Sequence, residues 1–197
     1  MLMIHQTEET PEQFTVTVFT EDKVGLLNRI TIVFTRRHLN IDSLTTSESE
    51  VPGIFRYTIV THCTESLIKK VTTQIEKLTE VLRAFYFHEE DVIYQEIALY
   101  KVSTSNIVNG HIIEKIVRQS NARVLDIEDG FIVIEKTGYK DETQQLFNQL
   151  EPYGILQFAR SGRVAVTRPK KELSNYLRDL VKAAEISNTI RDWKLKN

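Results

Sequence analysis

The chain has 197 residues, of which 41% are hydrophobic and 26% charged, which is typical of a folded globular protein and excludes a disordered or fibrous one. Its length allows two small domains or one of medium size. A formal net charge of -2 gives no reason to expect nucleic acid or an anionic membrane as a partner.

The sequence also predicts the cellular compartment of the protein. No apolar run reaches the ~18 residues of a membrane-spanning helix, and the first residues lack the basic start and apolar core of a signal peptide. The single cysteine, Cys63, excludes an internal disulfide and fits a reducing environment. We expect a cytoplasmic protein that does not enter a membrane.

The first half of the chain predicts the order β-α-β-β-α-β. The polar residues 1–13, with Pro11, predict a loose leader. Apolar residues then alternate at strand spacing or recur at helical spacing. The expected elements are a half-buried strand at 14–19, a helix at 25–37 with Leu26, Leu27, Ile30, Val33 and Phe34 on its apolar face, a strand from Asn40, a turn at 51–53, a strand at 54–62, a helix at 65–79 and a strand from Val81.

The same order recurs in the second half. The expected elements are a strand at 92–102, a helix at 107–120 with Ile112, Ile113, Ile116 and Val117 inward, a strand pair at 122–137, a helix at 140–151 and terminal strands at 154–167. This repeat predicts an α+β fold of two tandem ferredoxin-like βαββαβ domains, at 14–91 and 92–168. A further amphipathic helix, about 171–193, is expected within a C-terminal extension at 169–197.

No catalytic or metal-binding constellation stands out. No two of the five histidines are spaced i, i+4, and His62 and Cys63 are neighbours on a strand, where adjacent side chains face opposite ways. There is no phosphate-binding glycine motif and no nucleophile elbow. The run Glu89–Asp91 is best read as a solvated turn. RNA-recognition modules share this element order, but the strand at 54–62 lacks their Gly-aromatic pattern.

A polar turn with one glycine precedes the first helix. The backbone N–H groups at a helix N-terminus attract a carboxylate, and Gly25 has no Cβ to keep a ligand away. Asp22 stands where it could cap the helix or pair with a ligand ammonium group. The turn therefore suits an amino-acid zwitterion, although the spacing alone favours the other interpretation, in which Asp22 and Gly25 only cap and tighten the turn.

The segment 18–60 carries a longer set of motifs: G-L-L-x-R-I, then F-x-x-R, then N-I-x-S-L-T, then a proline and R-x-T-I. With these motifs it resembles the ACT domain of the regulatory (small) subunits of acetohydroxyacid synthase, also called acetolactate synthase. The sequence F-A-R-S-G at 158–162 is similar to the end of that family's C-terminal domain. The resemblance covers about residues 14–168.

The resemblance implies a subunit that does no chemistry and binds no cofactor. A separate catalytic large subunit, with thiamine diphosphate, Mg²⁺ and FAD, makes acetolactate for branched-chain amino acid biosynthesis. The regulatory subunit raises its activity and confers feedback inhibition by valine, which binds where two ACT domains pair as a homodimer. The implied effector-binding residues are Asp22, Lys23, Val24, Gly25 and Leu26 of one protomer with Asn40 and Ile41 of the other.

The resemblance also implies a loop that touches the catalytic subunit, for which a plain hairpin bent at Pro52–Gly53 is the other interpretation. The residues of this contact loop would be Thr45, Thr46, Glu48, Glu50, Pro52, Phe55 and Arg56.

Two positions depart from the family pattern. Asp22 stands where the family usually has Asn, whose amide donates to a ligand carboxylate, so leucine and isoleucine stay open as effectors beside valine. His38 replaces a usual glycine, so we expect it to take a left-handed conformation. The alternative function is a free-standing ACT-domain sensor that regulates another enzyme or a transcription factor.

Overall fold

The computed structural model describes residues 10–104 and 110–168, together with Arg178 and Lys182. The described part forms two compact units, one of residues up to Ile93 and those from Val166, the other of Tyr94–Ala165. The predicted C-terminal helix at 171–193 lies outside the described residues, apart from those two positions. In the described part, no helix is long and apolar enough to cross a membrane.

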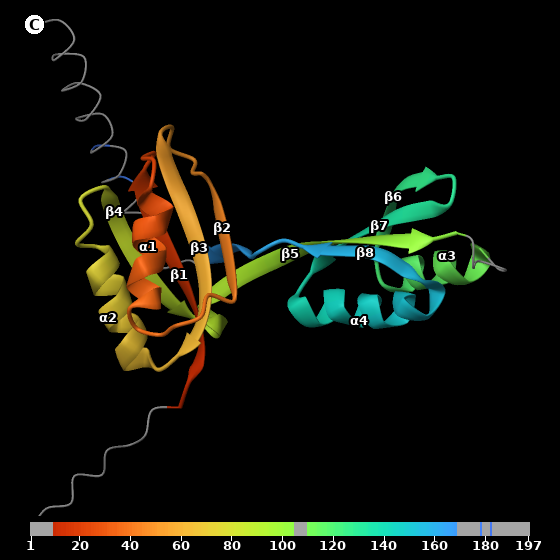
Figure 1. Cartoon of the computed structure of the whole chain (residues 1–197), viewed down its shortest axis with the longest axis horizontal. Helices are drawn as coiled ribbons and strands as arrows, with labels where there is room; N and C mark the ends of the chain where they lie inside the picture. The colour runs from red at the N-terminus through yellow and green to blue at the C-terminus, as the bar shows by residue number, and fades with distance from the viewer. Residues whose placement is uncertain (1–9, 105–109, 169–177, 179–181, 183–197) are drawn as a thin grey trace, which may run out of the picture. The chain divides into compact units, whose positions relative to one another are not determined.

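The first unit has the predicted β-α-β-β-α-β order (Figure 1). Its elements are β1 (Glu12–Glu21), α1 (Leu26–Thr35), β2 (Ser43–Glu48), β3 (Ile54–Cys63), α2 (Glu65–Ile75) and β4 (Val81–His88). The strands form an antiparallel sheet in the order β2-β3-β1-β4, so β2 is an edge strand. The two helices pack on one face of this sheet over a single apolar core.

Strand β1 is buried on both of its faces. Phe14, Val16 and Val18 point into the core below the helices. Thr15 and Thr17, on the other face, are equally buried. The expectation of a half-buried strand at 14–19 is therefore wrong. The alternation of apolar and polar residues shows the polarity of each strand face, but it does not show whether other parts of the chain cover the polar face.

The second unit repeats the plan after the short 3₁₀ turn η1 (Glu89–Asp91). Its elements are β5 (Val92–Ser103), α3 (Gly110–Gln119), β6 (Arg123–Glu128), β7 (Phe131–Gly138), α4 (Lys140–Leu150), η2 (Glu151–Tyr153), β8 (Ile155–Arg160) and β9 (Val164–Thr167). The sheet order is β6-β7-β5-β8, with β9 also paired to β5. Helices α3 and α4 cover one face over a second core.

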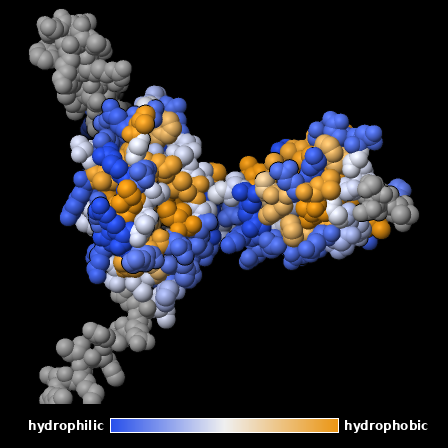
Figure 2. Space-filling model, in the orientation of Figure 1, coloured by the Kyte–Doolittle hydropathy of each residue, from blue (hydrophilic) through white to orange (hydrophobic). Residues whose placement is uncertain are grey.

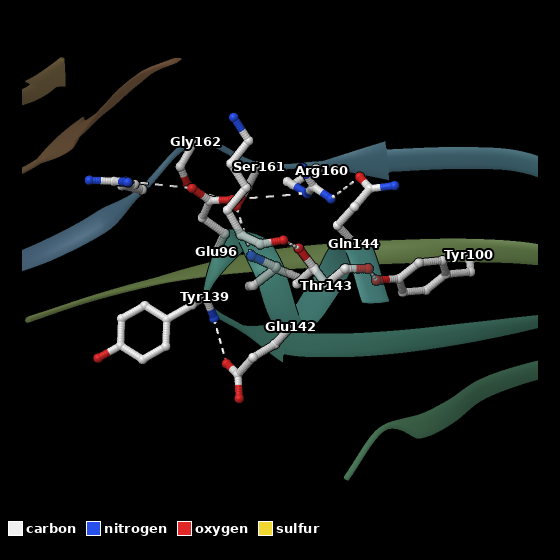
Figure 3. A network of polar contacts seen from close by, with 12 residues as sticks. Glu96, Tyr100, Tyr139, Glu142, Thr143, Gln144, Arg160, Ser161 and Gly162 are labelled. Atoms are coloured by element: carbon white, nitrogen blue, oxygen red, sulfur yellow. Dashed lines mark hydrogen bonds and ion pairs between the residues drawn. The ribbon is translucent and has the colours of Figure 1, made fainter. Parts of the chain in front are cut away.

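Strands β8 and β9 both pair with β5, and hydrogen bonds and ion pairs hold the segment between them (Figure 3). The Ser161 N–H donates to the Ile97 carbonyl (2.8 Å), and the Ser161 hydroxyl accepts from the Ile97 N–H (2.9 Å). The buried Glu96 carboxylate lies 3.6 Å from the Arg163 Nε and 3.9 Å from the Arg160 Nε. One backbone hydrogen bond and a side-chain network thus hold the chain where it leaves the regular ladder.

Several predicted details differ from the structure. Strand β1 begins at Glu12, two residues inside the predicted leader, and α2 ends at Ile75, short of residue 79. Leu27 and Ile112 were predicted to face the cores but are 39% and 41% exposed. Each lies at the edge of its apolar stripe, where the helical period alone does not decide burial.

Candidate functional site

The turn before α1 leaves its backbone open. Gly25 caps the helix in a left-handed conformation (φ 83°), and a Cβ built on it would meet nothing within 4 Å. Residues Glu21–Gly25 are exposed, with Val24 fully so. The first N–H groups of an α-helix have no carbonyl partner within the helix. Of these, the Leu26 N–H donates to the Lys23 carbonyl at 3.3 Å, so it is already engaged by the turn.

Asp22 does not cap α1. The capping residue is Gly25, and no side chain makes the cap hydrogen bond, so the capping role predicted for Asp22 is wrong. Two residues separate Asp22 from Gly25, and the chain passes through a turn between them. The Asp22 carboxylate therefore stands exposed beside the open helix end.

An ion pair holds the start of α1 to the loop before β4. The Arg29 guanidinium contacts the Glu80 carboxylate, and the Glu21 N–H donates to the Glu80 carbonyl (3.0 Å). The hydrogen bond from Arg29 lowers the pKa of Glu80, with burial opposing it. Glu80 thus anchors both sides of the turn, which gives the open N–H groups a defined position.

Asn40 and Ile41 lie at the other end of α1. His38 has a φ of 55°, which confirms the predicted left-handed turn, and the Asn40 carbonyl accepts from the Thr61 hydroxyl (2.7 Å). A ten-residue helix spans roughly 15 Å, so one protomer does not bring Asn40 and Ile41 to the Gly25 turn. Within one chain the structure therefore leaves the predicted effector residues in two separate groups.

The predicted contact loop is mostly strand. Thr45, Thr46 and Glu48 belong to β2, and Phe55 and Arg56 to β3, which leaves a hairpin turn at 49–53. The interpretation as a hairpin bent at Pro52–Gly53 is confirmed.

The hairpin turn is held by its own contacts. The Gly53 N–H donates to the Glu48 carboxylate at 3.0 Å, and Val51 packs against Phe19 and Ile54.

The Gly25 turn and the hairpin turn extend from the same end of the sheet. Glu21, the last residue of β1, pairs with Ile54, the first residue of β3 (Figure 1). The hydropathy surface shows hydrophobic residues among hydrophilic ones on the visible face of this unit (Figure 2). The turn at 21–25 with its predicted effector residues and the predicted contact hairpin therefore lie at one end of the sheet.

Comparison with known proteins defines the class first. Residues 16–83 match the family model described as "AHAS small subunit-like ACT domain", and residues 95–169 match "Small subunit of acetolactate synthase". The chain is thus a two-domain regulatory protein with an ACT domain in front.

Individual relatives narrow the assignment. The chain is 37% identical over 154 residues to the acetolactate synthase small subunit of Mycolicibacterium smegmatis, which covers 78% of this chain and 90% of that protein. It is 35% identical over 158 residues to that of Bacillus subtilis, covering 78% and 89%. The crystal structure of the Thermotoga maritima small subunit matches with a TM-score of 0.74 at 27% identity, covering 81% of this chain and 99% of that one. This chain belongs to the family of acetolactate synthase small subunits.

Membership has direct consequences. It supports the role of a regulatory, non-catalytic subunit in branched-chain amino acid biosynthesis, and it implies a catalytic subunit as partner.

Sequence reasoning missed a group of residues behind the hairpin turn. Thr17, Phe85, Phe87 and Thr167 line a cavity together with the predicted contact residues Glu50 and Arg56. The only signal in the sequence was Phe-Tyr-Phe at 85–87, whose two phenylalanines share a strand face.

Proposed function

We propose that this chain activates the catalytic subunit of acetolactate synthase and makes it sensitive to valine bound between two ACT domains. The open helix end at Gly25 supports this, because N–H groups and the helix dipole there favour a carboxylate. The catalytic subunit would carry the thiamine diphosphate, Mg²⁺ and FAD, and this chain none of them.

The observation that carries the proposal is the position of the two groups of effector residues at opposite ends of α1 beside an edge strand. A two-fold pairing through β2 makes the two β2 strands and the two α1 helices antiparallel. The Gly25 turn of one protomer then comes next to Asn40 and Ile41 of the other. One such pairing completes two equivalent sites, whereas a monomer contains none.

The signal would pass from the effector turn to the hairpin turn at 49–53. The Gly25 turn follows Glu21 and the hairpin turn precedes Ile54, and these two residues are paired, so a ligand that orders the end of β1 would bias the pose of the hairpin. Coupling of this kind amounts to about 1–3 kcal/mol, or roughly 5–150-fold in affinity. The hairpin with Arg56 would be the part that touches the catalytic subunit.

The choice of effector depends on Asp22. Its carboxylate repels a ligand carboxylate where an amide would donate to it, so valine binds more weakly here than at an Asn-containing turn. Leucine and isoleucine have the same charged groups as valine, so the shape of the side chain decides which of the three amino acids binds most tightly.

The test is acetolactate formation by the catalytic subunit from the same source, with and without this protein, under titration with valine, leucine and isoleucine. Gly25→Asp should abolish the inhibition and keep the activation. Gly130→Asp is the matched control, since Gly130 also has a positive φ (90°) and an open Cβ position but lies in the second unit. Inhibition that survives in the Gly25→Asp protein would contradict the site.

The second candidate function, a free-standing ACT-domain sensor, predicts a different outcome. The protein would bind an amino acid yet leave acetolactate formation unchanged, and it would not copurify with a thiamine-dependent enzyme.

A further inference from the structure

A cavity of about 340 Å³ lies in the first unit, on the sheet face opposite the two helices. Strands β1, β3 and β4 form its floor, and the hairpin turn and the end of β9 form its walls. All of its lining residues belong to the first compact unit. It shares no residue with the Gly25 turn, so it is a separate site.

The strand register places the lining side chains together. Thr17 is paired with Thr58 on one side and Phe85 on the other, and Phe19 is paired with Arg56. Paired residues of neighbouring strands project from the same sheet face. The cavity floor is therefore a consequence of pairing between segments that are 40–70 residues apart, roughly, in a β-α-β-β-α-β chain.

One end of the cavity carries both signs of charge. Burial lowers the pKa of Arg56, and the nearby Glu50 carboxylate opposes this shift. The Arg56 guanidinium also lies 5.8 Å from the centre of the Phe19 ring. A partly desolvated guanidinium beside a carboxylate can bind a ligand that carries the two opposite charges.

The rest of the cavity lining is aromatic or carries hydroxyl groups. The Phe85 and Phe87 ring centres are 6.1 Å apart and present an apolar surface. The Thr167 hydroxyl is buried, and no described residue hydrogen-bonds to it; the same holds for Thr15 and Thr45, which share this sheet face. Because buried hydroxyls are normally hydrogen-bonded, the Thr167 hydroxyl, which lines the cavity, favours a polar guest.

We propose that this cavity binds a free amino acid as its zwitterion. The ligand carboxylate pairs with Arg56, its ammonium group with Glu50, and its apolar side chain packs on Phe85 and Phe87. A volume of about 340 Å³ is near the lower end for ligand pockets, which suits a molecule of this size. Since Glu50 belongs to the hairpin turn, a bound amino acid ties that turn to β3.

The experiment measures binding to the whole chain by titration calorimetry in a Gly25→Asp background, which removes the proposed effector turn. The probes are L-valine, L-leucine and L-phenylalanine, and 3-methyl-2-oxobutanoate serves as the analogue that lacks the ammonium group. Arg56→Met should weaken amino-acid binding at least about tenfold, through loss of the charge-assisted bond. Arg83→Met is the control, because Arg83 is an exposed arginine of β4 outside the cavity.

A second variant keeps the proposal testable if Arg56→Met fails to fold. Thr167→Val removes only the hydroxyl that has no described partner, so the melting temperature of the free protein should not fall while amino-acid affinity drops several-fold. Three results would overturn the proposal. These are no amino-acid binding in the Gly25→Asp background, binding unaffected by either cavity variant, and oxo-acid binding as tight as that of valine. The first would mean a cavity that holds water only, and the second would mean that the amino acid binds elsewhere. None of the three depends on whether valine inhibits the catalytic subunit.

Discussion

At the scale of single residues, the effector turn depends on one glycine and one carboxylate. Gly25 supplies a left-handed backbone that leaves the helix end open, and Asp22 adds a negative charge beside it without capping the helix. Glu80, through Arg29 and the Glu21 N–H, keeps the turn in place. The charge of Asp22 and the ion pair of Glu80 are therefore the two features of this turn that substitution can test.

Asp22→Asn should raise effector affinity about tenfold, because it removes a repulsive charge and adds a donor for the ligand carboxylate. The measurement is the valine concentration for half-maximal inhibition in the complex with the catalytic subunit. Asp129→Asn, an equal change in an exposed turn of the second unit, should have no effect. If Asp22→Asn leaves the valine concentration for half-maximal inhibition unchanged, the side chain of residue 22 does not face the ligand.

Glu80→Gln should lower the melting temperature at neutral pH and have little effect in acid. The pKa of Glu80 is lowered in the folded state by the bond from Arg29, so the stabilisation is present above the unfolded pKa and is lost as the pH falls through the folded one. Melting curves of both proteins from pH 7 to about pH 3 check this. A difference that grows towards low pH would contradict the assignment.

At the scale of elements, the junction of β8 and β9 is held by specific contacts, so that both strands pair with β5 although the chain is interrupted between them. Ser161 exchanges hydrogen bonds with Ile97, and Glu96 is flanked by two arginines. Arg163 is only 3% exposed and lies 3.7 Å from the centre of the Tyr94 ring. A buried cation of this kind needs its carboxylate partner to remain in the fold.

Glu96→Gln should therefore destabilise the protein by about 3 kcal/mol, because it leaves the Arg163 charge buried without its counter-charge. Urea unfolding monitored by circular dichroism measures the change. Glu151→Gln, at an exposed glutamate of η2, is the matched control and should be neutral. A Glu96→Gln protein as stable as the control would show that the arginines are adequately held by other groups.

At the scale of the whole molecule, each protomer carries the two groups of predicted effector residues at opposite ends of α1. The effector groups are separated by the length of α1, so only a pairing of chains can join them. The exposed edge strand β2 is the natural surface for that pairing. Under the proposed function, effector binding and dimerisation are linked, whereas binding in the proposed cavity site is not.

Thr46→Lys should weaken the dimer at least about tenfold, since two-fold symmetry brings like charges together along the exposed β2 edge. Sedimentation equilibrium measures dimerisation, and calorimetry on the same samples should show that effector affinity falls with it. Gln157→Lys adds the same charge to exposed β8 and serves as the control. A monomeric Thr46→Lys protein that still binds the effector at full affinity would rule out the shared site.

Local patterns in the sequence determined the order of elements, the repeat and the turn at Gly25, because each depends on a few neighbouring residues. The left-handed conformation of His38 was predicted from the family resemblance and is confirmed. Tertiary structure alone decided that Asp22 does not cap α1, that both faces of β1 are buried, and that Leu27 is exposed. It also decided that Thr17, Arg56, Phe87 and Thr167 line one cavity. The reason is physical: periodicity is a property of a short segment, whereas burial and shared sites depend on the strand register that brings distant segments together.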